Sequence, residues 1–204
     1  MVWSAHRIYL NATSGALAHV RSDPVLHRHS FLLTGALPAS WDSKHGEIRI
    51  PDPGLLVIKE VGPHDSYGTD DWLSWDALQG PPTLDPFDSA ALAELEDHQR
   101  PPLAFLRYLR ELQNRSRAPV TFYACETWAG DVDSEYACVL AERDILYLYP
   151  ESTEQTGAIA RDQAESIETD ILQRTLRHHG IDLPTPFFAP HLREFAWERY
   201  RLAH

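Results

Sequence analysis

The chain of 204 residues is 43% hydrophobic and 10% aromatic, and this composition excludes a disordered or a fibrous protein. Its 30 acidic residues against 18 Lys and Arg give a formal net charge of -12, which argues against binding to nucleic acid or to an anionic membrane, because both need a positive surface. A chain of this length can bury a full core without disulfides or metal, so we expect a single α+β domain over residues 1–204 with no cofactor.

Short apolar or β-branched runs in the N-terminal part of the chain predict strands. They are separated by Gly and Pro turn signals, as in an antiparallel sheet, and cover residues 6–10, 30–34, 46–50 and 55–59. Residues 62–87 contain so many Gly and Pro residues that no long regular element is expected there. We predict a long ordered loop, in which two tryptophans lie among acidic residues.

Helical and strand patterns alternate in the middle of the chain. A first helix is predicted from about Ser89 and is interrupted at Pro101, and a second, amphipathic helix begins near Pro102. Three β-rich runs follow and predict a meander of antiparallel strands, at residues 119–126, 135–140 and 145–149.

The C-terminal third is predicted to be helical. One helix carries a buried stripe within residues 160–172 and stops at Gly180, and a last helix follows Pro190. The predicted fold class is therefore α+β, mainly an antiparallel sheet packed with three to four helices.

Negative charge is concentrated in one region of the sequence. Residues 51–100 contain eleven acids against two cations, Lys59 and Arg100, which gives a local net charge of -9. A patch of this kind can steer a basic protein partner into contact, because complementary fields raise association rates. The alternative is that these acids only keep the protein in solution.

Four carboxylates surround the tip of the predicted hairpin, namely Glu126, Asp131, Asp133 and Glu135. Paired carboxylates can serve as general acid and base or bind Ca²⁺ or Mg²⁺, but the spacing does not fit an EF-hand loop. Together with Trp128 they can form a recognition tip for a basic partner, since Trp is favoured at interface hot spots. The alternative is a tight turn at Gly130 with solvated acids and Trp128 packed on the sheet.

Histidine pairs are the second group of candidates for chemistry. His27 and His29 are expected on one face of a strand, as in some zinc sites, but no further ligands follow from the spacing. His178 and His179 suit the C-terminal end of a helix dipole. No His-Glu-x-x-His, Cys-x-x-Cys, nucleophile elbow or phosphate-binding loop occurs, so the sequence favours a protein that is not an enzyme.

The two cysteines and the N-terminal sequence provide information on the cellular compartment of the protein. Cys125 and Cys138 fall on neighbouring predicted strands, where a disulfide is conceivable, but buried reduced thiols are the simpler expectation. No signal peptide and no apolar run of about 20 residues are recognised. We therefore expect a soluble, cytoplasmic protein.

The hairpin over residues 122–137 resembles a strand-loop-strand found in some bacterial immunity proteins and related uncharacterised proteins. In that pattern an aromatic-rich strand runs into an aromatic-Gly-Gly-acid turn and returns as Glu-Tyr-Ala, whereas this chain has Ala129 where the pattern has Gly. The resemblance implies a small cytosolic protein that binds and blocks a toxin delivered between bacteria, with an acidic surface that covers a basic active site.

We therefore predict that acidic loops bind a basic cognate protein, a bacterial toxin. The predicted contact residues are Asp70, Asp71, Trp72, Trp75, Asp76, Glu126, Trp128, Asp131, Asp133 and Glu135. One alternative is a small metal-assisted hydrolase that uses the hairpin carboxylates with His27 or His29. Another is a structural component of a larger complex, held by exposed Trp197 and Tyr200 on the last helix.

Overall fold

A seven-stranded antiparallel sheet forms the centre of the protein, in the order β11-β10-β9-β8-β1-β5-β2. The computed structural model describes residues 3–38, 46–62, 72–81, 101–128, 131–141, 144–148, 153–156, 171–184, 188–191 and 195–203. The strands of the sheet are β1 (Trp3–Asn11), β2 (Ser30–Leu33), β5 (Leu55–Lys59), β8 (Val120–Trp128), β9 (Asp131–Ala141), β10 (Asp144–Leu148) and β11 (Thr153–Thr156). Two short pairs are separate from it, antiparallel β3 (Ala36–Pro38) with β4 (Glu47–Arg49) and parallel β6 (Val61–Gly62) with β7 (Leu73–Ser74).

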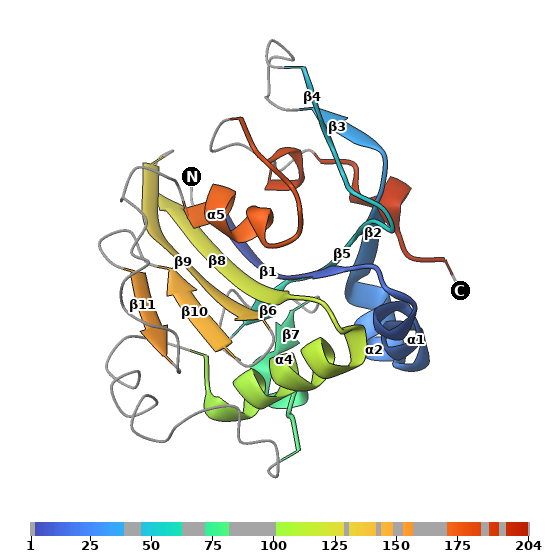
Figure 1. Cartoon of the computed structure of the whole chain (residues 1–204), viewed down its shortest axis with the longest axis vertical. Helices are drawn as coiled ribbons and strands as arrows, with labels where there is room; N and C mark the ends of the chain where they lie inside the picture. The colour runs from blue at the N-terminus through green and yellow to red at the C-terminus, as the bar shows by residue number, and fades with distance from the viewer. Residues whose placement is uncertain are drawn as a thin grey trace.

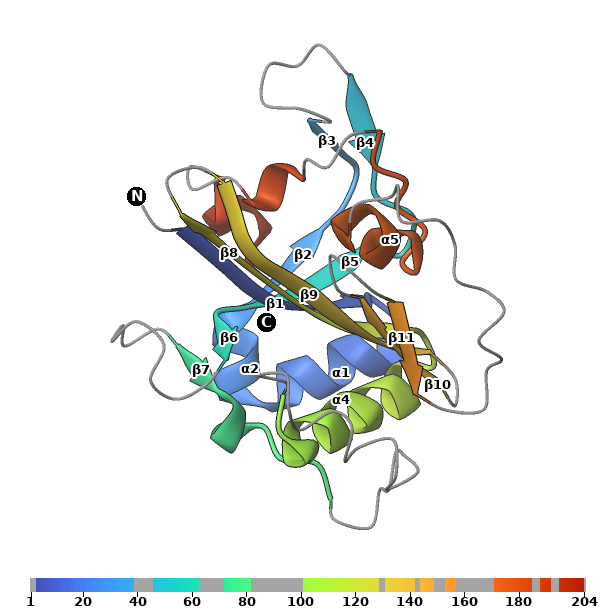
Figure 2. The same cartoon turned by 90° about the vertical axis from the view of Figure 1, so that its left-hand side faces the viewer.

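Helices lie on both faces of the sheet, so the fold is α+β (Figures 1 and 2). One face, here called the helical face, is covered by α1 (Ser14–Ser22), α2 (Pro24–His29) and α4 (Leu103–Ser116). The other, the C-terminal face, is covered by α5 (Ile171–Arg177) and the chain that follows it. Short 3-10 turns are η1 (Trp75–Ala77), η3 (Ala189–His191) and η4 (Trp197–Tyr200).

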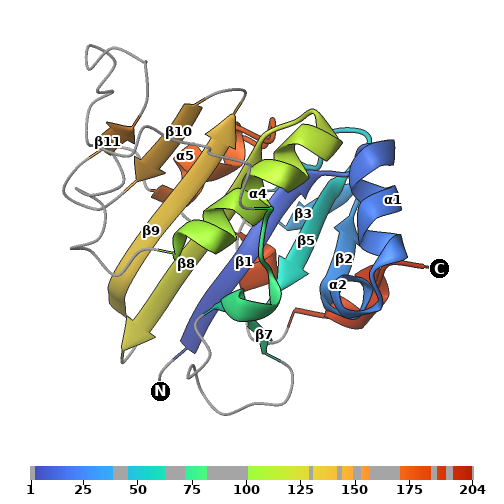
Figure 3. The same cartoon turned by 90° about the horizontal axis from the view of Figure 1, so that it is seen from below.

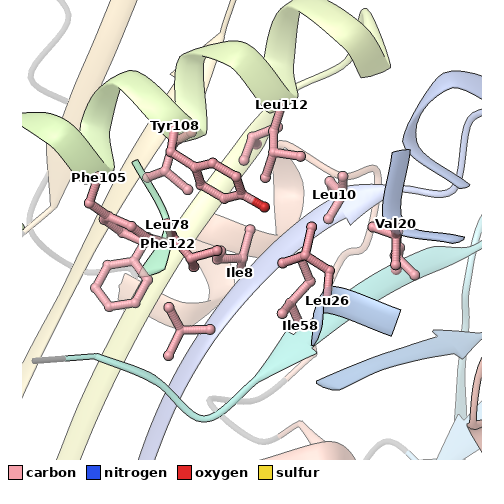
Figure 4. Packing of buried hydrophobic residues seen from close by; sticks show 14 of the residues in the cluster. Ile8, Leu10, Val20, Leu26, Ile58, Leu78, Phe105, Tyr108, Leu112 and Phe122 are labelled. Carbon is pink, nitrogen blue, oxygen red and sulfur yellow. The ribbon is translucent and has the colours of Figure 1, made fainter. Parts of the chain in front are cut away.

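The central strand β1 contributes to two separate cores, because successive side chains of a strand point to opposite faces. On the helical face, Ile8 and Leu10 are fully buried and pack with Leu26, Phe105 and Phe122 (Figure 4). On the C-terminal face, the second core includes Tyr9, Val57, Tyr123, Leu176 and Phe188. Because its side chains alternate between the two faces, the single strand β1 contributes to both cores of the fold.

Trp197 is buried in the second core, where the sequence predicted an exposed oligomer contact on a helix. Two cations lie over its ring, with the Arg7 guanidinium 5.0 Å and Lys59 Nζ 4.8 Å from the ring centroid. Tyr200 is half-buried and stacks on Phe195, with ring centroids 5.2 Å apart. Cation–π contacts therefore hold this C-terminal turn on the sheet, and the prediction that Trp197 is exposed is wrong.

Residues 14–29 form two helices where the sequence predicted strands and turns. Thr13 Oγ1 accepts a hydrogen bond from the Ala16 N–H at 3.3 Å and caps α1. Asp23 Oδ1 accepts from the Val25 N–H at 2.9 Å and caps α2, which begins at Pro24. The Asp23-Pro24 pair was interpreted as a turn signal, but it is a helix N-cap followed by proline at the first helical position.

The helical conformation also separates His27 and His29, which were predicted to share one face of a strand. Two residues on an α-helix differ by about 200° in direction, so the side chains leave α2 on different sides. His29 is buried and His27 is half-buried. The prediction of two imidazoles side by side on a strand is therefore wrong.

The other predicted elements of the N-terminal half and the middle of the chain are largely confirmed. The expected strands correspond to β1, β2, β4 and β5, the meander to β8, β9 and β10, and the second helix to α4. Residues 72–81 of the predicted long loop contain only the short strand β7 and the turn η1. The helix predicted from Ser89 to Pro101 lies almost wholly outside the described residues.

The C-terminal third is only partly helical in the described residues. Residues 157–170, which hold most of the predicted stripe, lie outside them, but α5 continues that pattern. Gly180 has φ +74° and closes the turn after α5, as predicted. After Pro190, the described residues form the short turn η4 in place of the predicted helix.

The two cysteines lie on opposite faces of the sheet and are not joined in a disulfide. Phe122 on β8 pairs with Cys138 on β9, which leaves Cys125 three residues away along β8. An odd offset along a strand reverses the side-chain direction, so the two sulfur atoms cannot meet. The expectation of buried reduced thiols is confirmed.

His179 forms a hydrogen-bonded bridge between the chain after α5 and the sheet. Its Nδ1 lies 2.8 Å from Asn11 Oδ1, and its Nε2 lies 2.9 Å from Thr121 Oγ1. A neutral ring satisfies both contacts when Nδ1–H donates to Asn11 and the Thr121 hydroxyl donates to Nε2. His178 is exposed, so packing on the sheet, and not the helix dipole, explains His179.

We predict that His179 makes the protein sensitive to acid. Burial lowers its pKa from 6.5 to about 3, so the unfolded chain takes up this proton first. The contribution of neutral His179 to the free energy of unfolding is fully present above pH 6.5. It is lost as the pH falls towards 3, at about 1.4 kcal/mol per pH unit. Denaturant unfolding at pH 7, 6, 5 and 4 measures this slope.

The substitution His179→Gln is expected to lower stability at pH 7 by about 1–3 kcal/mol, because buried partners lose their hydrogen bonds. The same variant is expected to lose less stability than the wild type on acidification. His178→Gln is the matched control at an exposed neighbour and should leave stability at pH 7 nearly unchanged. It should change the acid slope far less than His179→Gln does, because burial is the main cause of the lowered pKa of His179 and His178 a smaller one. Equal acid slopes in His179→Gln and the wild type would contradict the prediction.

Candidate functional site

Several strand ends meet at one end of the sheet, where segments distant in the sequence come together (Figure 3). β1 begins there, and its antiparallel neighbours β5 and β8 end there. β9 begins at the same end, because it pairs antiparallel with β8. Glu60, Glu126 and Glu135 lie on these strand ends together with Trp72, and we call this region the acidic end.

On the helical face of the acidic end, His6 lies beside Glu126. His6 pairs with Ala124 across β1 and β8, so Glu126 is its diagonal neighbour. His6 Nε2 lies 3.6 Å from Glu126 Oε1, and the side chains are 7% and 38% exposed. This distance is too long for a hydrogen bond but suits an ion pair when the imidazole carries a proton.

Trp72 covers this histidine. The two ring centroids are 5.3 Å apart at an interplanar angle of 59°. The parallel pairing of β6 and β7 places Gly62 opposite Ser74, and the Leu73 N–H donates to Glu60 O at 2.7 Å. A Cβ on Gly62 would overlap Cζ2 of Trp72 and lie 3.1 Å from His6 Nδ1, so the indole fits only because residue 62 is glycine.

The environment of His6 favours the neutral ring at pH 7. Burial lowers the pKa of His6 below its ordinary value of 6.5, while the nearby Glu126 and Glu60 carboxylates act in the opposite direction. Neither ring nitrogen makes a hydrogen bond to any residue in the described part of the chain. Buried imidazole nitrogens without a hydrogen bond cost stability and are uncommon in folded proteins.

On the C-terminal face of the acidic end, Tyr123 and Glu135 form a second diagonal pair. The Tyr123 hydroxyl donates to Glu135 Oε1 at 2.7 Å. Burial raises the pKa of Tyr123 well above 10, so the phenol stays protonated and remains a donor. The bond fixes the Glu135 carboxylate at the start of β9.

A tyrosine–histidine hydrogen bond lies deeper on the same face. Tyr9 Oη is 2.5 Å from His191 Nε2. Burial raises the pKa of Tyr9 to about 12 and lowers that of His191 well below 6.5, so a neutral phenol donates to a neutral imidazole. Arg7 Nη1 donates to Pro190 O at 2.7 Å and holds the same turn. Tyr9, Arg7 and Pro190 are buried and His191 is half-buried, and together these groups fix the C-terminal chain.

The structure brings two of the predicted contact residues together on the helical face, Trp72 and Glu126, whereas Glu135 lies on the C-terminal face of the same end. The Trp75 ring packs against Phe105 and Phe122, with centroids 5.6 and 5.9 Å away, and so belongs mainly to the core of the helical face. Asp76 is exposed in η1. Asp70 and Asp71 lie outside the described residues, as do the side chains of Trp128, Asp131 and Asp133, whose backbone is placed in β8 and β9.

Two residues of the acidic end were not among the predicted site residues, His6 and Glu60. The signal for His6 is its position in the apolar alternation with Ile8 and Leu10, which places an imidazole on a core face. Glu60 has no comparable signal, because only the chain reversal after β5, with φ +57° at this residue, directs it to the site.

The described residues offer little support for metal chemistry. Among them, no group of three or more His, Cys, Asp or Glu side chains is arranged to hold a metal ion. His27 and His29 lie on α2, which packs near β5, whereas Glu126 and Glu135 lie on β8 and β9. The histidines proposed for a hydrolase are therefore on a different part of the sheet from the hairpin carboxylates.

Comparison of the chain with models of protein families, with curated proteins and with solved structures finds no match in any of the three. Within the described parts of the chain, no helix has both the length and the apolar character needed to cross a membrane. The case for a function rests on the geometry of the acidic end.

We predict that Gly62→Ala displaces the Trp72 indole from His6, because the new methyl group occupies the space of the ring. Overpacking of this kind is expected to cost about 1–3 kcal/mol. The indole N–H resonance of Trp72 in a ¹H–¹⁵N NMR spectrum is the direct measurement, and denaturant unfolding gives the change in stability.

Gly35→Ala is the control for backbone effects. Gly35 has φ +76°, and nothing lies within 4 Å of an added Cβ. It is expected to lose about 1 kcal/mol through backbone strain without moving the Trp72 resonance. A Trp72 resonance that stays in place in Gly62→Ala would show that the ring does not depend on this glycine.

Proposed function

We propose that this chain is a protein-binding protein of the immunity or antitoxin type, which neutralises a basic bacterial toxin through its acidic end. The supporting observation is that Glu60, Glu126 and Glu135 lie on adjoining strand ends, although they come from separate parts of the sequence. A rigid sheet that presents carboxylates from several strands can hold a fixed pattern of charge for a partner.

The charges around the acidic end favour a positively charged partner. Glu126 is partly exposed and lies beside a histidine whose pKa is lowered, so its negative charge is not cancelled by that ring at pH 7. Lys59 Nζ lies 3.2 Å from Glu60 Oε1 and offsets part of the charge there. The region from 51 to 100, which supplies Glu60 and Trp72, has a net charge of -9.

Trp72 adds an aromatic surface to these acids. The ring is half-buried, and its position over His6 restricts its motion. Tryptophans held in place beside charged groups are favoured at interface hot spots, because they add contact area at a low cost in side-chain entropy. A basic partner can therefore meet both carboxylates and an indole on this surface.

We predict that binding weakens when charge is reversed at Glu126 of the acidic end and at the predicted contact residues Asp131 and Asp133 of the same hairpin. The tagged wild-type chain is first used at low salt to capture its partner from a lysate of the native organism, and the purified partner then serves for biolayer interferometry. The variant Glu126→Lys/Asp131→Lys/Asp133→Lys is expected to bind at least about tenfold more weakly, chiefly through a slower association rate.

Asp182→Lys is the control for a charge reversal away from the acidic end. The Asp182 side chain is 84% exposed and follows His179, which is bonded to Asn11 and Thr121 at the opposite end of β1 and β8. It should leave the affinity nearly unchanged. Equal affinities of the triple variant and the wild type, or a wild-type chain that retains no basic protein at low salt, would overturn the proposed function.

A further inference from the structure

His6 at the acidic end is buried, and within the described residues neither of its ring nitrogens has a hydrogen-bond partner. The side chain is 7% exposed, and its Nε2 points to a carboxylate oxygen 3.6 Å away. A neutral imidazole gains little from this neighbour at such a distance. An imidazolium at the same place gains a charge-assisted contact after a movement of a few tenths of an ångström.

Charged and neutral groups face His6 from every neighbouring element. Glu126 on β8 is the nearest carboxylate, and Glu60 follows β5. Arg7, the next residue on β1, is the opposing cation. The remaining neighbours among the described residues are Trp72, Gly62 and Phe122, which carry no titratable group. Two carboxylates against one cation make proton uptake feasible in spite of burial.

We infer that His6 is a proton-operated switch of the acidic end, in which a proton on His6 closes an ion pair with Glu126 and withdraws that carboxylate from a basic partner. The consequence for binding rests on the proposed function. Proton uptake adds a positive charge directly below Trp72 and neutralises the local field of Glu126. A basic partner and the proton therefore compete for the same carboxylate.

This competition sets the direction of the pH dependence. Because two ligands that weaken each other do so by the same factor, a partner cation beside Glu126 lowers the proton affinity of His6, and the proton lowers the affinity for the partner. Binding is therefore strongest at neutral pH and weakens as the pH falls and His6 takes up its proton. The switch needs no movement of the strands, since Glu126 and His6 are already diagonal neighbours.

The first test follows the His6 ring by NMR in the isolated protein between pH 7.5 and the onset of acid unfolding. In the wild type, His6 is expected to titrate within the folded state. In Glu126→Gln the midpoint is expected to fall by about one pH unit, because the nearest carboxylate has lost its charge. Glu135→Gln removes a carboxylate from the opposite face of the same hairpin and should leave the midpoint unchanged.

The second test uses His6→Phe, which keeps a buried ring but cannot bind a proton. The indole N–H resonance of Trp72 is expected to follow the His6 midpoint in the wild type and to lose that transition in His6→Phe. A His6 ring that stays neutral until the protein unfolds, or a midpoint that is the same in Glu126→Gln and the wild type, would overturn the inference.

Both tests use the chain alone, so they are independent of the partner. A failed charge-reversal experiment with a normal His6 titration would remove the proposed function and leave the proton switch. The reverse result would keep the binding surface and remove the switch.

Discussion

The pairing of β1 between β5 and β8 is the constraint on which the rest of the structure depends. Through it, His6, Ile8 and Leu10 point to the helical face, and Arg7, Tyr9 and Asn11 point to the C-terminal face. A shift of the register by one residue would exchange the two sets and place a guanidinium in the core of Phe105 and Phe122. The apolar run on one face and the polar run on the other therefore fix the register of the central sheet.

Hydrogen-bonded histidines hold the C-terminal face, in the bridge from Asn11 through His179 to Thr121 and the bond from Tyr9 to His191. These bonds hold the C-terminal chain against strands far away in the sequence, and they require neutral imidazoles. The helical face is held by apolar packing, and His6 at its edge lacks such bonds. The histidines that fix the fold, His179 and His191, are thus hydrogen-bonded, whereas His6, which we connect with function, has no hydrogen bond within the described residues.

The acidic end joins this architecture to the proposed binding role. Strand ends on a rigid sheet hold charged side chains in fixed relative positions, which loops of the same composition do not. Trp72 reaches this end through the short parallel pairing of β6 with β7 and through the space left by Gly62. The same contact covers His6 and lowers its pKa, so the surface that presents charge also contains a group that can change it.

The sequence by itself determined the antiparallel character of the sheet, most strands, the amphipathic α4 and the excess of acid, because strand and helix periodicities and charge are local properties. It misassigned α1 and α2, since caps such as Asp23 also occur in turns. Only the tertiary structure decided that His6, Glu60, Trp72 and Glu126 share one end, that Trp197 is buried, and that Cys125 and Cys138 point apart. These features depend on strand order and register. Both are set by pairing between segments far apart in the sequence, so the residue type at a single position does not predict them.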